Sequence, residues 1–297
     1  MTTVRLPRTA AGHAPAVTRQ AQRWKALVSH NLAATVGGLF LLFVVFCSVA
    51  APLLSPYDPI QIDIPQRLQA PSWPHLFGTD EFGRDLLTRV LYGGRPVLLT
   101  SFLSVLAAAV AGTAIGTLAG YLGGQVDNLL MRLIDVMLSF PAVLLAILIV
   151  AALGTGVPNA IIAVTFSLVP TFARVARALA LSLTLEQFVV ASHAIGATGP
   201  QIIWRHLLPN LLPPIIVQAT AMLAIAVAFA SALSFLGLGV EPPTPDWGLM
   251  VSEGQRLIYD ALWVPFFPGL AITLTVLAVN FLGDGLRDRL DPTLRNR

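Results

Sequence analysis

Residues 190–214 form a polar stretch in an otherwise apolar sequence. The side chains whose types and spacing could do chemistry lie in and just before this stretch. Thr184 with Gln187, and Thr198 with Gln201, form two T-x-x-Q pairs. In such a pair the hydroxyl accepts from a free helical amide, and the glutamine side chain reaches back to the capping amide. This spacing predicts recognition rather than bond breaking, because two short helices exposed between membrane spans suit docking in another protein's groove.

The two helices are expected to meet at an angle. The first should cover residues 185–195 and end at Gly196, which can adopt the left-handed conformation of a helix terminus. The second should cover residues 199–208 and be closed or kinked by Pro209. We call residues 184–210 the elbow. The simpler alternative is that they only connect two spans.

The other reactive side chains do not form a recognisable catalytic set. The histidines show no two-His helical metal motif, and we expect His193 and His206 at a surface or interface. Asp260 and Asp284 faintly resemble the paired aspartates of intramembrane proteases, but G-x-G-D is absent because Phe281 stands at the first required glycine. The apolar runs hold no ionisable group clearly at mid-membrane, so a membrane enzyme or a proton relay lacks its usual groups.

Composition decides the class of protein. Of the 297 residues, 56% are hydrophobic and only 11% are charged, whereas soluble domains average about a quarter charged residues. The mean hydropathy of +0.76 agrees. The net charge of +3 is too small and dispersed to indicate nucleic acid, and the single Cys47 cannot form a disulfide within the chain. The sequence predicts an all-α integral membrane protein.

One absence bears on how such a protein would be energised. Lys25 is the only lysine and lies in the N-terminal tail, so the chain has no G-x-x-x-x-G-K-[ST] phosphate loop. Any nucleotide that drives its work must therefore be bound by another subunit. We expect this chain to bind no cofactor and no metal.

Runs without Asp, Glu, Lys or Arg predict six transmembrane helices of about 20 residues each. In order, they are expected near residues 31–54, within 96–126, twice within 136–173, within 206–240 and near 265–282. A cleaved signal peptide competes for the first, but the apolar stretch exceeds a usual h-region. The turn that separates the third span from the fourth is expected at residues 154–158.

Small residues mark one face of the second span, where Ala108, Gly112, Gly116 and Gly120 recur every four positions. Such a face lets two helix backbones approach closely in lipid, so we expect tight packing against another helix. A flexible hinge is the alternative.

The polar segment before this span is rich in proline and ends in mixed charges. We expect a folded loop at the membrane surface rather than a metal site, because ligand spacing is lacking. The charges are Asp80, Glu81, Arg84, Asp85 and Arg89.

Charge bias orients the spans. Thirteen of the 18 Lys and Arg residues fall in the tails, the elbow and the segments on the elbow's side, which places the elbow and both termini in the cytoplasm. The expected organisation is a cytoplasmic tail (1–31), a first span with an extracytoplasmic loop (32–95), a core of five spans carrying the elbow (96–286) and a second cytoplasmic tail (287–297).

The elbow resembles the signature of permease subunits of binding-protein-dependent ABC importers, E-A-A-x-x-x-G followed by a spacer and I-x-L-P. The chain matches it at Ala191, Gly196 and Pro209. It departs from it at Val190, Ser192 and His206. The departure at Val190 removes any ion pair that the family's Glu makes there.

The resemblance covers most of residues 30–292. FGTDEFGRDLLTRVLYGGR, GYLGGQVDNLLMRLIDVMLSFP, LSFLGLGVEPPTPDWGLM and GLAITLTVLAVNFLGDGLRDRLDP stand in the family's order. They look like the second permease of dipeptide, oligopeptide and nickel importers, and most like dipeptide-permease C-type subunits.

This resemblance implies a six-helix permease of the type I importer class in a bacterial inner membrane, with no enzymatic activity of its own. Its partners would be a second, homologous permease, two cytoplasmic ATPase subunits that use ATP and Mg, and an extracytoplasmic solute-binding protein. The solute would be a dipeptide or oligopeptide, with glutathione or a nickel chelate as alternatives. The implied ATPase contacts are Ala191, Ser192, His193, Ile195, Gly196, Ala197, Arg205 and Pro209. A stand-alone secondary carrier remains a hypothesis from another class, and it would transport without partners.

Overall fold

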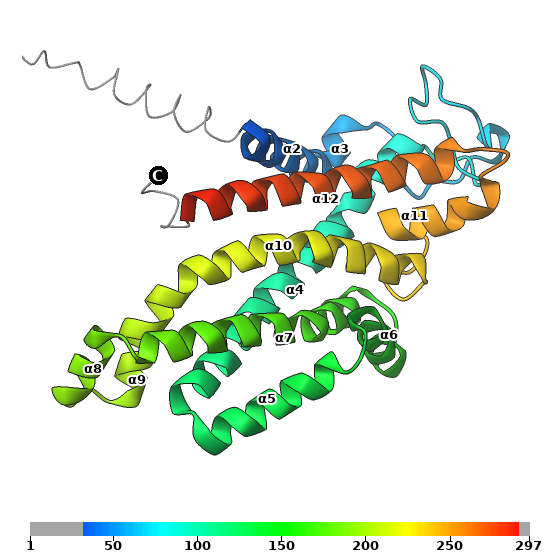
Figure 1. The fold of residues 1–297 in the computed structure, drawn as a ribbon. Coiled ribbons are helices and arrows are strands. Elements are labelled where there is room, and N and C mark those ends of the chain that lie inside the picture. The colour runs from blue at the N-terminus through cyan, green and yellow to red at the C-terminus, as the bar shows by residue number, and fades with distance from the viewer. Residues whose placement is uncertain (1–31, 291–297) are drawn as a thin grey trace, which may run out of the picture.

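The computed structural model describes residues 32–290, and this part of the chain is built from helices (Figure 1). The predictions for residues 1–31 and 291–297 lie outside the described residues. In chain order the elements are α2 (Leu32–Val49), α3 (Ala51–Leu54), η1 (Ile64–Gln66), α4 (Leu86–Leu122), α5 (Gly124–Leu138), α6 (Ala142–Leu153), α7 (Val157–Thr184), α8 (Gln187–Ala194), α9 (Gly199–Ile202), the π-helical segment η2 (Ile203–Leu207), α10 (Leu208–Phe235), α11 (Trp247–Gly254), η3 (Gln255–Leu257) and α12 (Trp263–Leu290).

Five helices in the described part are long and apolar enough to cross a membrane: α2, α4, α7, the continuous helix Gly199–Phe235, and α12. The sixth candidate is the pair α5 and α6, which passes the same test only together and meets at 90°, the geometry of a broken span or a re-entrant loop. With 12 residues, α6 alone is too short, about 18 Å against a hydrocarbon core of about 30 Å.

The prediction that the third span lies within residues 136–173 is therefore wrong. The helix pair begins at Gly124, in the amphipathic α5, and its apolar half, α6, begins only after the break that ends at Pro141. The residue before a proline is disfavoured in the helical region, which separates α5 from α6. The predicted turn at residues 154–158 is confirmed, since α6 ends at Leu153 and α7 begins at Val157.

Two helices extend further than their charge-free runs. α4 begins at Leu86, ten residues before the predicted run, because Asp85 caps it by accepting from the Thr88 amide at 2.8 Å. α7 continues past its apolar run to Thr184 and carries two arginines. Arg177 forms a two-point ion pair with Asp127 of α5, with both distances 2.5 Å. This pair fixes the polar end of α5 against α7.

The small-residue face of α4 is confirmed as a packing seam against α7. A Cβ added at Gly112 would lie 2.5 Å from the Phe172 Cβ, and one at Gly116 would lie 2.2 Å from the Ala173 carbonyl oxygen. At Gly120 the nearest atoms, at 2.8 Å, belong to Arg177 and Ala180. The two backbones therefore touch where any side chain would hold them apart, as small-residue helix pairs do in lipid.

The first span is held by its neighbours in two ways. α2 packs against α12 at Gly37, where an added Cβ would lie 2.7 Å from the Ala278 carbonyl oxygen. Arg95 of α4 donates to two carbonyls at the C-terminal end of α2, Ser48 at 2.7 Å and Val49 at 3.0 Å. Carbonyls in the last turn of a helix lack intrahelical partners, so this arginine caps α2.

The segment after α10 folds back as α11, which packs against α10, α12 and α4. Asp246 caps α11 through the amides of Gly248 and Leu249, at 2.9 and 3.2 Å. Trp247 is buried and its indole N–H donates to the Val90 carbonyl at 2.7 Å. α11 is thereby tied to the first turns of α4.

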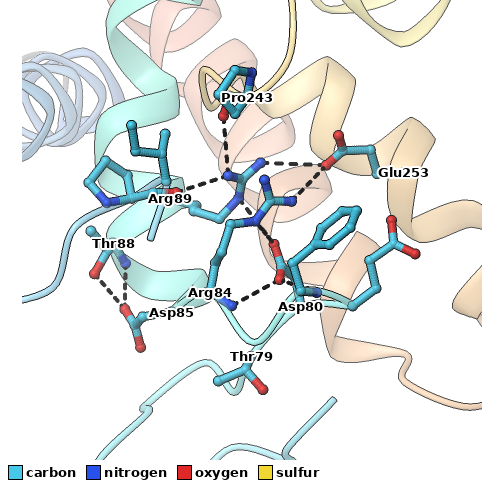
Figure 2. Close-up of polar contacts among 12 residues, drawn as sticks. Thr79, Asp80, Arg84, Asp85, Thr88, Arg89, Pro243 and Glu253 are labelled. Carbon is cyan, nitrogen blue, oxygen red and sulfur yellow. Dashed lines mark hydrogen bonds and ion pairs between the residues drawn. The ribbon is translucent and has the colours of Figure 1, made fainter. Parts of the chain in front are cut away.

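A buried ionic cluster joins this end of α4 to α11, as predicted for a folded loop (Figure 2). Arg84 pairs with Asp80 at 2.6 Å, and Arg89, only 1% exposed, lies 3.4 Å from the same carboxylate oxygen. Both guanidinium groups approach Glu253 of α11, at 3.6 and 3.4 Å. Two positive and two negative groups therefore compensate one another out of water.

The same cluster also fixes two loops. Arg89 donates to the carbonyl of Pro59 at 3.0 Å and to that of Pro243 at 3.4 Å. Burial raises the pKa of Glu253, although Arg89 and Arg84 act in the opposite direction. The Pro59 loop, the Pro243 loop and α11 thus converge on one arginine of α4.

The protease alternative does not agree with the fold. Asp260 stands just before α12, whereas Asp284 lies near its other end, about 30 Å further along the helix axis. The two carboxylates cannot share a substrate. Among the described residues, no three His, Cys, Asp or Glu side chains are grouped so that they could hold a metal ion.

Gly116→Ala should destabilise the protein through the α4–α7 seam. Its methyl group would lie 2.2 Å from the Ala173 oxygen, and overpacking of this kind costs about 1–3 kcal/mol. We expect a lower melting temperature in detergent. Ala107→Val, on an exposed face of the same helix, is the matched control; equal melting of both variants would contradict the seam.

Asp246 should make stability depend on pH. Burial raises its pKa from 3.8 to about 6, while the Leu249 and Gly248 amides act in the opposite direction. Its contribution is complete below the unfolded pKa and is lost as the pH rises through the folded pKa, a change of up to about 3 kcal/mol. Asp246→Asn keeps the capping oxygen but cannot ionise. Relative to this variant, the native chain should melt progressively lower between pH 4 and pH 7; parallel melting curves would contradict the assignment.

Candidate functional site

The elbow is an ordered helix pair whose corner is built on Gly196. α8 ends as Gly196 takes φ +85°, and its amide donates to the His193 carbonyl at 3.0 Å. The next amide, of Ala197, donates to the Ser192 carbonyl, also at 3.0 Å. This pair of bonds is a Schellman motif, which satisfies the last carbonyls of a helix and reverses the chain. The prediction that Gly196 ends the first elbow helix in a left-handed conformation is confirmed.

Of the two predicted helix caps, the one at Thr198 is confirmed and the one at Thr184 is wrong. Thr198 and Gln201 form the expected capping box, and the Thr198 amide donates to Gln201 Oε1 at 2.9 Å. Thr184 does not cap α8; it is the last residue of α7, and its hydroxyl donates to the Leu181 carbonyl at 2.8 Å. α8 instead begins after Glu186, because α7 extends further than its apolar run.

The second helix also does not end where the sequence indicated. It passes through the π-helical segment η2 into α10, and Pro209 stands in the first turn of α10 without closing the helix. A proline has no amide to donate, and the first turn of a helix tolerates this. The elbow is therefore continuous with a membrane span.

Buried side chains hold the elbow to the helices beneath it. Val189, Ile202 and Leu207 are fully buried and belong to the same apolar core as α4 and α7. The rings of His193 and Tyr121, at the end of α4, are stacked at 6.2 Å with an interplanar angle of 4°. Tyr121 also lies within 3.3 Å of the position of an added Cβ at Gly199. The elbow is thus attached to α4 as well as to α7 and α10.

The predicted contact residues do not share one environment. Six are exposed, Ala197 is half-buried, and Ser192 is buried. The Ser192 hydroxyl donates to the Phe188 carbonyl at 2.7 Å and lies 3.2 Å from His206 Nε2. The exposed members are Ala191, His193, Ile195, Gly196, Arg205 and Pro209.

The elbow exposes large apolar side chains among its polar ones, and the predicted residue set included only some of them. Ile195 is 86% exposed, Leu185 82% and Trp204 74%. Large apolar side chains left exposed suit an interaction surface, and Trp204 among them borders the groove between α4 and α10. Leu185 and Trp204 were not among the predicted contact residues. Their position as large apolar residues within a polar stretch could have indicated them. Tyr121 was also missed, and the signature around Gly196 contains nothing that points to it.

Comparisons with known proteins agree with this architecture. Residues 112–296 match the family described as binding-protein-dependent transport system inner membrane component, and residues 20–71 match the N-terminal TM domain of oligopeptide transport permease C. These two matches together span most of the chain.

Several bacterial proteins are similar to the chain over nearly its whole length. The dipeptide transport system permease protein DppC of Alkalihalophilus pseudofirmus is 44% identical, over 95% of this chain and 92% of the relative. The di/tripeptide transport system permease protein DppC of Pseudomonas aeruginosa is 44% identical, over 90% of each chain. The glutathione transport system permease protein GsiD of Escherichia coli is 42% identical, over 92% of this chain and 90% of the relative.

A solved structure of the MetNI methionine ABC transporter in an inward-facing conformation has a similar fold. Its TM-score is 0.54 at 22% identity, covering 68% of this chain and 96% of that chain. At this identity the likeness concerns the fold alone.

Gly196→Val should loosen the corner of the elbow without a steric clash, because no atom lies within 4 Å of an added Cβ. A β-branched residue opposes positive φ, at a cost of about 1–2 kcal/mol. We expect faster hydrogen exchange at the amides of residues 196 and 197. Gly196→Asn, which tolerates this conformation, should exchange nearly as the native chain does; equal rates in all three would contradict the assigned strain.

Proposed function

Since the chain belongs to the family of binding-protein-dependent transport system inner membrane components, we propose that it forms half of the translocation path of an importer for short peptides. It is the multi-pass permease subunit of an ABC importer. The relatives named for dipeptides, di/tripeptides and glutathione share one chemistry, a short chain with peptide bonds. That shared chemistry supports a peptide-like solute.

The observation that carries the proposal is the elbow, an ordered and exposed corner that presents large apolar side chains and is attached to three membrane helices. A force applied to such a corner is passed to α4, α7 and α10 instead of being absorbed by a loose loop. The exposed set Ala191, His193, Ile195 and Gly196 would seat in a groove of an ATPase subunit. Buried Ser192 would act behind this surface, by holding α8 to His206.

The proposed assembly contains a second, homologous permease, two ATPase subunits and an extracytoplasmic solute-binding protein. ATP and Mg belong to the ATPase subunits, in keeping with the single lysine of this chain. ATP-driven closure of the two ATPase subunits would draw the two elbows together and switch the path between its two orientations. Catalysis is assigned to the partners, and this chain transmits the movement.

The elbow and both termini are proposed to face the cytoplasm. The excess of Lys and Arg on that side supports this orientation. The start of α2, the end of α12 and the elbow also lie toward the same end of the molecule in Figure 1. The buried ionic cluster at the other end would then face the binding protein.

Ala191→Arg should uncouple ATP hydrolysis from uptake, because a bulky charge at an exposed elbow position would obstruct seating in the ATPase groove. The complete importer is assembled with its partners in nanodiscs or proteoliposomes. Its rate of ATP hydrolysis should be retained, whereas its rate of peptide uptake should fall by more than about tenfold. Ala191→Ser retains a small side chain and is the matched control.

Two results would contradict the proposal. Normal uptake with Ala191→Arg would make the elbow a mere connection. Uptake by the purified chain alone, driven by an ion gradient, would make the protein a secondary carrier.

A further inference from the structure

A polar groove of about 490 Å³ lies along the elbow-side part of α10, between α7 and α12. α10 passes between these two helices and packs against both (Figure 1). The volume of the groove falls in the range of small-molecule sites, about 300–1,000 Å³. Two amides and two opposite charges line it, namely Gln218, Asn280, Asp284 and Arg287.

The two amide side chains lie within the membrane-spanning helices. Gln218 follows the elbow by eight residues, about 12 Å along α10, and Asn280 stands one turn before Asp284, the first charged residue of α12. Among the described residues, neither amide has a hydrogen-bond partner. An amide unpaired in hydrocarbon is costly, and polar groups within a span ordinarily face a protein interior or a water-filled cavity. Acyl chains are therefore a poor match for this groove.

The two charges lie further along α12. Asp284 and Arg287 are exposed and three residues apart, a spacing that puts their Cβ atoms about 5–6 Å from each other. Within the part of the chain that the structure describes, neither forms an ion pair. Two extended residues of a peptide span a similar length, at most about 7 Å. A carboxylate and a guanidinium at this spacing complement a small ligand that carries both an ammonium and a carboxylate.

The base of the groove fixes the distance between these groups. Gly283 of α12 is buried there, and an added Cβ would lie 3.2 Å from the Thr220 Oγ1 of α10. The two helices therefore touch beneath the polar side chains. Gln218 on α10 and the three polar groups on α12 are thereby held on opposite sides of one contact.

We propose that this groove binds a zwitterionic short peptide on its way to the cytoplasm, with Asp284 taking its ammonium and Arg287 its carboxylate. Gln218 and Asn280 bind the amide between those ends. The assignment rests on the proposed importer function and adds a binding site to it. The four groups bind features that all dipeptides with free ends share, so the site selects free ends rather than one side-chain sequence.

The headgroup of phosphatidylethanolamine offers the same chemistry, since it also carries an ammonium and an anion. The depth of the two amides favours the peptide. A headgroup at Asp284 and Arg287 would place its acyl chains against the amides, which would then stay without partners. A peptide supplies partners to all four groups.

Protection of a cysteine tests the site in the complete importer. Ala221→Cys, exposed in the groove lining, is introduced in a Cys47→Ser background, which has no other cysteine in this chain. In nucleotide-free nanodiscs, saturating dialanine should slow its modification by a charged methanethiosulfonate about tenfold or more. Dialanine acetylated and amidated at its ends should protect at least about tenfold less well. Gln125→Cys, exposed on α5 outside the groove, is the matched control and should show no protection.

Neutral variants separate recognition of the peptide's ends from simple occlusion. Asp284→Asn and Arg287→Gln should each raise the dialanine concentration that gives half protection by about tenfold, because each removes one charge-assisted bond. Asp288→Asn, exposed on the same helix but outside the groove lining, should leave that concentration unchanged. The same half-protecting concentration in all three variants would overturn the assignment.

The other contrary outcomes identify what occupies the groove instead. Modification slowed by phosphatidylethanolamine in the nanodisc, and not by dialanine, would assign the groove to lipid. No modification in the absence of peptide, with or without ATP, would mean that the second permease covers it. Either result contradicts the peptide site. ATP-dependent peptide uptake by the Cys47→Ser importer would still leave the proposed function intact, whereas a lack of such uptake would contradict that function itself.

Discussion

The close approach of α4 and α7 is the constraint on which the rest of the structure depends. Along Gly112, Gly116 and Gly120 the two backbones meet where a methyl group would not fit. Lipid provides no hydrophobic drive for helices to associate, so such a pair is held by dispersion contacts and by the polar groups at its ends. Beside the seam, the Arg177–Asp127 pair holds α5 against α7.

The seam has a consequence at each end of α4. At one end, Tyr121 stacks on His193, so the elbow is attached to the helix pair and not only to the chain ends that lead into it. At the other end, the buried cluster around Arg89 ties α4 to α11 and to two loops. α4 therefore links the surface proposed to receive the force with the surface proposed to face the binding protein.

Sequence patterns predicted what depends on local chemistry. The four-residue spacing of small residues predicted the α4–α7 seam, and Gly196 predicted the corner between the two elbow helices. The T-x-x-Q spacing predicted the capping box at Thr198. The predicted helix ends were wrong where a helix continues beyond its apolar run. α7 continued through Arg174 and Arg177, which pair with Asp135 and Asp127, and Thr184 is therefore the last residue of α7 and not the cap of α8. The stacking of Tyr121 on His193 depends on a contact between distant residues, which no local spacing encodes.

The central claim is that the elbow is a rigid extension of the α4–α7 pair. Spin labels at Ile195→Cys and Leu99→Cys, both at exposed positions, in a Cys47→Ser background, measure it as a distance between the elbow and the far part of α4 in the assembled importer. The account predicts one narrow distance distribution that stays unchanged between the nucleotide-free and ATP-bound states. A broad distribution, or a distance that shifts by several ångströms between those states, would make the elbow a flexible connection and contradict the account.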